Sequence, residues 1–200
     1  MKKNLALFDF DGTITTKDTF LEFIKFYHGK PKFTLGFLIL SPVMVMMVLK
    51  LIPNWRAKEI VLTWFFKDED LNHFNQQGEK FCREVVPSLL RPQALTELEK
   101  HKQNSATTLL VVSASAQNWV EPWCKSIGVE CLATRLEVKS SKLTGKLLGK
   151  NCFGEEKVVR IKEKLDLLTF ETISAYGDSS GDYQMLEIAT QKFYKPFRTT

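Results

Sequence analysis

A short apolar run that ends on two acids constrains the fold of this chain most strongly. Residues 5–13 read Leu-Ala-Leu-Phe-Asp-Phe-Asp-Gly-Thr. The unbroken apolar run is typical of a strand that is buried on both faces of a sheet. Side chains two residues apart point to the same side of a strand, so we expect the carboxylates of Asp9 and Asp11 to lie together while Phe10 packs inward. Gly12 allows a sharp turn that brings backbone N–H groups close to a ligand.

Two adjacent carboxylates repel each other, and they destabilise the fold unless a cation or a proton lies between them. A divalent metal ion resolves this repulsion, and hard oxygen ligands of this kind favour Mg²⁺. The other interpretation is a strand that ends on two solvated acids and a turn, because Asp-Gly is an ordinary turn dipeptide. The stretch by itself leaves both interpretations open.

Polar residues follow later apolar strands as well. Ser113 ends the run Thr108-Leu-Leu-Val-Val-Ser113, and Asp178 follows the run Ile173-Ser-Ala-Tyr-Gly177. Strands that alternate with helices predict a parallel sheet with helices on both faces, and such sheets bind ligands at the carboxyl ends of their strands. We therefore expect Asp9, Ser113 and Asp178 to meet in one crevice.

The order of these motifs resembles the haloacid dehalogenase superfamily of aspartate-nucleophile phosphatases. The chain carries the opening Asp-x-Asp-Gly-Thr motif from Asp9 to Thr13, a serine after a strand, a lysine in Gly154-Glu-Glu-Lys157, and Gly-Asp-Ser-x-x-Asp from Gly177 to Asp182. Motifs of this kind are confirmed by their strand and helix context. The resemblance implies a Rossmann-like α/β core with an inserted α-helical cap. It also implies a Mg²⁺ ion bound by Asp9, Asp178 and the backbone carbonyl of Asp11.

This resemblance assigns a role to each motif residue. Asp9, whose unperturbed pKa of about 3.9 leaves it ionised at neutral pH, would attack the phosphorus and form an aspartyl-phosphate. Asp11 would protonate the leaving alkoxide and then activate water. Ser113 would donate a hydrogen bond to a phosphoryl oxygen, and Lys157 would supply positive charge. Asp182 would orient the metal's waters and Lys157.

Within the superfamily, the sequence resembles subfamily IB, the branch that contains phosphoserine phosphatases. In that branch a cap carboxylate and an arginine hold the amino acid part of the substrate, and Asp18 and Arg56 are the candidates here. Asp18 could equally cap a helix, Arg56 could be a surface residue, and Thr13 could be a substrate-binding or a turn residue. Gly12 replaces the usual serine and Ser113-Ala-Ser replaces Ser-Gly-Gly, so phosphoserine is one candidate among small phosphorylated substrates.

Other functions are less compatible with the sequence. Dehalogenation at carbon needs neither Asp11 nor a metal ion. A phosphotransferase remains an alternative, and a phospho-accepting signalling domain would be shorter and would lack a cap over its first strand. The net charge of +5 is spread over the chain, so nucleic acid is not an expected partner. The four cysteines form no C-x-x-C pair, which is typical of reduced thiols in a cytoplasmic enzyme. The oligomeric state stays open.

The long apolar stretch from Phe33 to Ile52 approaches the length of a membrane span, about 20 residues. Pro42 and Lys50 interrupt it, and a span here would separate Asp9 from Ser113, which must share one site. We therefore expect two short helices that meet near Pro42 and are buried in the cap, in preference to membrane contact.

The remaining pattern predicts one α/β core, residues 1–14 and 89–200, and a helical cap, residues 15–88. Helices are expected to begin at Asp18, Asn54 and Asp68, and the first should stop at Gly29. In the core, Ser115 is expected to cap a helix. Residues 134–148 should form a hairpin, and residues 154–168 should form a helix with Leu168 on its apolar face.

Overall fold

The central sheet of the computed structural model, which describes residues 3–198, has the strand order β3-β2-β1-β6-β7. All neighbouring strands are parallel, and β1 lies in the middle between β2 and β6. The strands are β1 Lys3–Phe8, β2 Thr107–Ala116, β3 Glu130–Thr134, β6 Phe170–Gly177 and β7 Gln191–Tyr194. The predicted parallel α/β sheet is confirmed.

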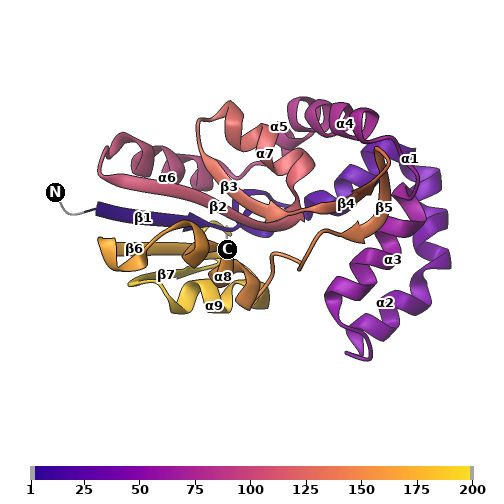
Figure 1. Cartoon of the computed structure of the whole chain (residues 1–200). Coiled ribbons are helices and arrows are strands. Elements are labelled where there is room, and N and C mark those ends of the chain that lie inside the picture. The colour runs from indigo at the N-terminus through magenta and orange to yellow at the C-terminus, as the bar shows by residue number, and fades with distance from the viewer. Residues whose placement is uncertain (1–2, 199–200) are drawn as a thin grey trace.

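Helices cover both faces of this sheet (Figure 1). The helices α6 (Pro92–Gln103) and α7 (Gln117–Ser126) lie on one face, and α8 (Glu155–Lys164) and α9 (Tyr183–Glu187) lie on the other. The strand β1 contributes Ala6 and Phe8 to the first core and Leu5 and Leu7 to the second. Its unbroken apolar run therefore exists because β1 is buried on both sides.

The segment between β1 and β2 is helical, as the sequence predicts, and most of it extends beyond the carboxyl end of the sheet (Figure 1). Its centre is aromatic: Phe23 packs edge-on against Phe74 and Phe81 and stacks on Trp119 of α7 with ring centroids 4.5 Å apart. The helices are α1 Thr19–Ile39, α2 Ser41–Val48, α3 Asn54–Phe66, α4 Leu71–Glu84 and α5 Val86–Leu89.

The predicted hairpin is present as β4 (Leu136–Lys139) and β5 (Lys142–Leu147). It packs against α3, and Leu143 exchanges backbone hydrogen bonds with Glu69 and Asp68. The hairpin thus joins the cap helices, although its sequence lies in the second core segment. The division into core and cap residues stays our interpretation.

Several helix ends differ from the sequence prediction. Asp18 caps α1 as expected, and its carboxylate accepts a hydrogen bond from the backbone N–H of Leu21. Gly29 has a non-helical φ of 77° and ψ of 161°, so it interrupts α1 where the sequence predicts a stop, and the helix resumes after it. Asp68 does not cap α4, because its φ of 67° places it in the turn with the hairpin, and Asp70 caps the helix.

The other boundaries shift by a few residues. Asn54 is the first residue of α3 and makes no capping hydrogen bond, and Ser115 lies inside β2. The helix α8 ends at Lys164, before a 3₁₀ turn η2 (Leu167–Thr169), so Leu168 is 95% exposed instead of packing on an apolar helix face. The short turn, which the apolar spacing did not reveal, is capped by Asp166.

The two predicted short helices of the stretch from Phe33 to Ile52 correspond to the end of α1 and to α2, and they meet at Leu40 with a bend of 60°. The expectation that this stretch is buried in the cap holds for Gly36 and Leu40 but is wrong for α2, which contains no buried residue in the described chain. Within residues 3–198, no single helix is long and apolar enough to cross a membrane, and α1 and α2 reach that length and composition only together.

We predict that the contact between α3 and the hairpin depends on Gly145. Both Gly145 and Gly149 have a φ of 79°, but a Cβ at Gly145 would lie 2.4 Å from Cα of Thr63, whereas nothing lies within 4 Å at Gly149. Gly145→Ala should therefore lower the free energy of unfolding by about 1–3 kcal/mol more than Gly149→Ala does. Urea denaturation of the two variants measures this difference, and equal losses would contradict the close packing.

Candidate active site

Three chain segments meet in one pocket at the carboxyl edge of the sheet. Asp9 follows β1, Asp178 follows β6, and Ala114 and Ser115 belong to β2. Helices of the cap close the pocket from the other side. The described residues that line it from the cap are Thr16, Lys17, Asp18, Phe20, Leu21, Phe37, Met44, Met47, Asn54, Ala57, Lys58 and Val61. The pocket thus has an acidic floor and a largely apolar roof.

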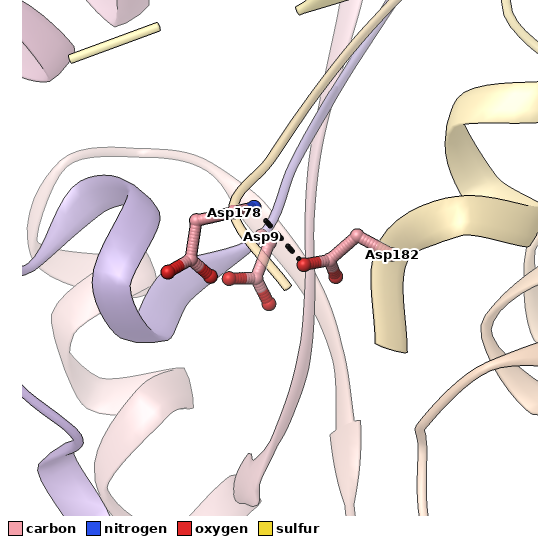
Figure 2. A group of neighbouring side chains, drawn as sticks. All are labelled: Asp9, Asp178 and Asp182. Atoms are coloured by element: carbon pink, nitrogen blue, oxygen red, sulfur yellow. Dashed lines mark hydrogen bonds between the residues drawn. The ribbon is translucent and has the colours of Figure 1, made fainter. Parts of the chain in front are cut away.

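The acidic floor consists of Asp9, Asp178 and Asp182 (Figure 2). Each offers one carboxylate oxygen, and these oxygens all lie within 4.8 Å of one another. Oxygen ligands from carboxylates suit Mg²⁺, which usually takes only one or two of them. The site is also shaped around Asp178, because a Cβ on Gly12 would lie 2.3 Å from its Oδ2. These residues fit a divalent metal ion.

Lys157 connects two of these acids. Its Nζ donates hydrogen bonds to Asp9 Oδ1 and Asp182 Oδ1, each at 2.6 Å, and to the backbone oxygen of Val112 at 2.7 Å. The side chain is fully buried, so these acceptors take all three of its protons. Burial disfavours the charged ammonium, but the charges of Asp9 and Asp182 more than offset this effect and raise the pKa of Lys157.

Both carboxylate oxygens of Asp182 are occupied by protein donors. Oδ1 accepts from Lys157, and Oδ2 accepts from the backbone N–H groups of Asp178 and Ser179 at 3.1 and 3.0 Å. The carboxylate also closes a capping box at the short turn η3 (Ser180–Asp182). Asp182 therefore holds Asp178 and Lys157 in place, and it has little capacity left for a metal ion.

Asp9 is buried against the other acids. Its Oδ2 accepts a hydrogen bond from the hydroxyl of Thr13 at 3.1 Å, and Oδ1 is bound by Lys157. Burial, to which the charges of Asp182 and Asp11 add, raises the pKa of Asp9 to about 8, although Lys157 opposes the shift. A further cation at this site would oppose this shift and favour the ionised carboxylate.

Asp11 lines the same pocket as Asp9 but has different hydrogen-bond partners. The chain turns at η1 (Phe10–Ile14), where Gly12 has a φ of 80°. Asp11 Oδ1 accepts from the backbone N–H and the hydroxyl of Thr19, at 2.6 and 2.5 Å, and Oδ2 accepts from Ser113 at 3.2 Å. Asp11 thus faces the start of the cap, and Phe10 is buried as expected.

Thr19 connects the cap to the core, a role that no sequence motif indicates. Besides its bonds to Asp11, its hydroxyl accepts from Nε1 of Trp119 at 3.0 Å and shares a hydrogen bond with Ser115 at 3.2 Å. Trp119 follows Thr19 by 100 residues, so only the tertiary fold brings them together. Ser113 is fully buried beneath this network.

The candidate substrate residues are placed differently. Asp18 lines the pocket, and its role toward a substrate stays a prediction. Arg56 is absent from the described pocket lining; its side chain is 53% exposed and lies 3.6 Å from Glu59. Lys58 points inward instead, and its Nζ donates to the backbone oxygen of Ala114 at 2.7 Å. Arg56 and Lys58 are two residues apart on α3, so their side chains face different directions, and only Lys58 reaches the pocket.

Arg198 is a second cation that the sequence did not indicate. It donates a hydrogen bond of 2.6 Å to Asp178 Oδ2 and lines the pocket. Burial raises the pKa of Asp178, while Arg198 lowers it. Because Arg198 lies outside every motif, only the structure places it at the site.

We predict that the hydroxyl of Thr19 stabilises the junction of cap and core. Thr19→Val keeps the shape but leaves Trp119 Nε1 without its acceptor and removes one donor to Asp11. The free energy of unfolding should fall by about 1–3 kcal/mol. Thr96→Val is the matched control, because the hydroxyl of Thr96 is exposed and bonds only within its own helix. Equal losses in urea denaturation would contradict the assignment.

The sequence model of the haloacid dehalogenase-like hydrolases matches residues 6–187. The chain is also 34% identical to protein CicA of Caulobacter vibrioides over 196 residues, which cover 97% of this chain and 86% of CicA. These matches extend over the core and the cap segments together.

Solved structures show the same fold. A protein of unknown function from Bordetella pertussis Tohama I superposes with a TM-score of 0.83 at 24% identity, covering 96% of this chain and 89% of that one. The phospho-aspartyl intermediate analogue of a phosphoserine phosphatase gives a TM-score of 0.63 at 24% identity, covering 96% and 86%. At these identities the similarity establishes the architecture.

Proposed function

This chain belongs to the haloacid dehalogenase-like hydrolase family, and we propose that it is a Mg²⁺-dependent phosphatase that forms an aspartyl-phosphate on Asp9. The observation that carries the proposal is the acidic floor of Asp9, Asp178 and Asp182, with the buried ammonium of Lys157 bound to Asp9 at 2.6 Å. An acidic site binds a phosphate dianion only if cations outweigh its own charge. The arrangement therefore fits a metal-assisted phosphoryl transfer.

Asp9 and Asp178 would hold the metal ion, together with the backbone carbonyl of Asp11 that the family pattern assigns. Bound there, Mg²⁺ would screen the carboxylate of Asp9 from the phosphoryl group and favour its ionised form. The close approach of Asp9, Asp178 and Asp182, whose carboxylate oxygens lie within 4.8 Å of one another, supports this requirement. Asp182 would act from outside, because its oxygens already hold Lys157, Asp178 and Ser179.

The protein groups then have distinct tasks. A carboxylate oxygen of Asp9 would attack phosphorus, the bond to the leaving oxygen would break, and Asp11 would donate a proton to that oxygen. Asp11 would next take a proton from water, which hydrolyses the acyl phosphate and restores Asp9. Lys157 would balance the charge around Asp9, and Ser113 and Thr19 would orient Asp11 through their hydrogen bonds.

Phosphoserine is a second candidate substrate, because the pocket presents Asp18 and Lys58, whose charges suit an ammonium and a carboxylate. The apolar roof around Phe37, Met44 and Met47 fits the serine moiety less well. A phosphotransferase or a phospho-accepting signalling domain would keep or pass on the phosphoryl group, so repeated release of inorganic phosphate distinguishes them from a phosphatase. We place the enzyme in the cytoplasm.

We predict Mg²⁺-dependent hydrolysis of p-nitrophenyl phosphate that EDTA abolishes. Asp9→Asn should reduce turnover to background, because an amide is a poor nucleophile and a poor metal ligand. The control is Asp166→Asn, which alters an exposed carboxylate that caps η2. Near-normal turnover of Asp9→Asn, measured by phosphate release, would reject the nucleophile.

We predict that the effect of Asp11→Asn depends on the leaving group. The amide keeps the size of the side chain but removes proton transfer, which contributes about 10²–10⁴-fold to a step. An alkyl phosphate needs its alkoxide protonated, whereas nitrophenolate leaves unaided, so turnover of the alkyl ester should fall far more. With p-nitrophenyl phosphate the aspartyl-phosphate should accumulate and be trapped by acid quench.

Equal losses for both esters, with no trapped phosphoenzyme, would show that Asp11 is not the general acid and base. The double variant Asp9→Asn, Asp11→Asn is the control for the trapping experiment. It should yield no phosphoenzyme with either ester, because the phosphorylated carboxylate is absent.

A further inference from the structure

The junction of α1 and α2 presents an unusual apolar surface, which we call the apolar corner. Its members are aliphatic or methionine side chains that are 37–73% exposed. They are Leu35, Leu38, Ile39, Val45, Met46, Val48, Leu49 and Leu51. Scattered exposed leucines are common in proteins, but a group of exposed apolar side chains within residues 35–51, at the junction of two helices, is typical of a surface that binds another apolar phase.

The corner is apolar on its inner side as well. Met44 and Met47 of α2 line the active-site pocket, whereas Val45 and Val48 of the same helix are 56% and 73% exposed. A helix that is apolar all round belongs in a protein interior or in a lipid phase. The inner side of α2 therefore belongs to the pocket, and its outer side requires a different partner.

The charge around the corner favours an anionic partner. Residues 23–58 contain no aspartate or glutamate, and their basic residues are Lys25, Lys30, Lys32, Lys50, Arg56 and Lys58. Lys30, Lys32 and Lys50 are exposed beside the apolar side chains. An apolar surface bordered by lysines is the pattern of helices that lie in the interface of an anionic membrane.

The helix geometry suits insertion into one leaflet. The 60° bend at Leu40 and the eight residues of α2 prevent a straight span. Trp55, at the start of α3, is 47% exposed, and tryptophan is enriched at the level of lipid head groups. Figure 1 shows α2 at the end of the molecule opposite the amino ends of the strands, so the core does not obstruct a flat surface there.

We propose that the apolar corner docks on an anionic phospholipid bilayer and that the pocket receives the phosphomonoester head group of a membrane lipid. The substrate part rests on the proposed phosphatase function, whereas the docking part does not. Phe37, Met44 and Met47 extend the pocket from the carboxylates to the helices of the corner. A lipid held by the bilayer would meet an apolar wall and reach the acidic floor with its phosphate.

Docking is tested by co-sedimentation of the full chain with vesicles, without turnover. The protein should sediment with vesicles of phosphatidylcholine and phosphatidylglycerol, less with phosphatidylcholine alone, and less at high salt.

Leu38→Ser combined with Val48→Ser should weaken vesicle binding roughly tenfold or more. The matched control Leu168→Ser, at a side chain 95% exposed near the opposite edge of the sheet, should leave binding unchanged. Lys50→Gln should weaken binding to anionic vesicles, whereas Lys162→Gln on α8 should not.

The docking surface would be overturned if the wild-type chain did not sediment with vesicles. Equal effects of the double variant and of the Leu168→Ser control on sedimentation would overturn it as well. Light scattering tests a protein partner: a dimer that the double variant dissociates, without vesicle binding, would assign the corner to self-association and reject the membrane proposal.

The substrate is tested with vesicles that contain phosphatidic acid. The wild-type chain should release phosphate from them, and the double variant should lose most of this activity while it hydrolyses p-nitrophenyl phosphate normally. Vesicle binding without hydrolysis of phosphatidic acid, alongside normal hydrolysis of the aryl ester, would overturn the lipid substrate. Vesicle binding without hydrolysis of either compound would reject the phosphatase function and support the docking surface.

Discussion

The buried ammonium of Lys157 is the interaction on which the site depends. It joins the end of β1 through Asp9, the strand β2 through Val112, and the turn η3 through Asp182. A buried ion pair adds little net stability over apolar residues of the same volume, but the loss of one partner costs about 3–5 kcal/mol, because the other charge stays buried and unpaired. Each member therefore requires the others, and three segments that are distant in sequence are fixed at one edge of the sheet. The short sequence motifs are the local parts of this single network.

The charge of this network explains its chemistry. Lys157 and Arg198 face the carboxylates of Asp9, Asp178 and Asp182, and Asp11 lies near enough to raise the pKa of Asp9. Acidic groups thus outnumber basic ones where the proposed phosphomonoester would approach. A divalent cation would reverse this balance, whereas a further lysine would neutralise only one charge. The imbalance is therefore one reason for including a metal ion in the proposed reaction.

The sequence predicted what depends on local pattern and strand topology. The buried strand β1, the hairpin and the convergence of Asp9 and Asp178 follow from apolar runs and from the carboxyl ends of parallel strands. It did not predict features that depend on how helices rotate and dock, such as Lys58 facing the pocket in place of Arg56, or Thr19 bound to Asp11. The predicted burial of α2 was wrong for a related reason, because hydrophobicity without periodicity does not show which side of a helix is covered.

The helix α1 connects the chemistry to the apolar corner. Its first residue, Thr19, binds Asp11, and its last turn carries Leu38 and Ile39. Gly29, with a non-helical φ of 77°, divides α1 into two helical halves between these ends. The first half therefore carries the contact with the proposed general acid, and the second half carries part of the surface that would dock on a membrane.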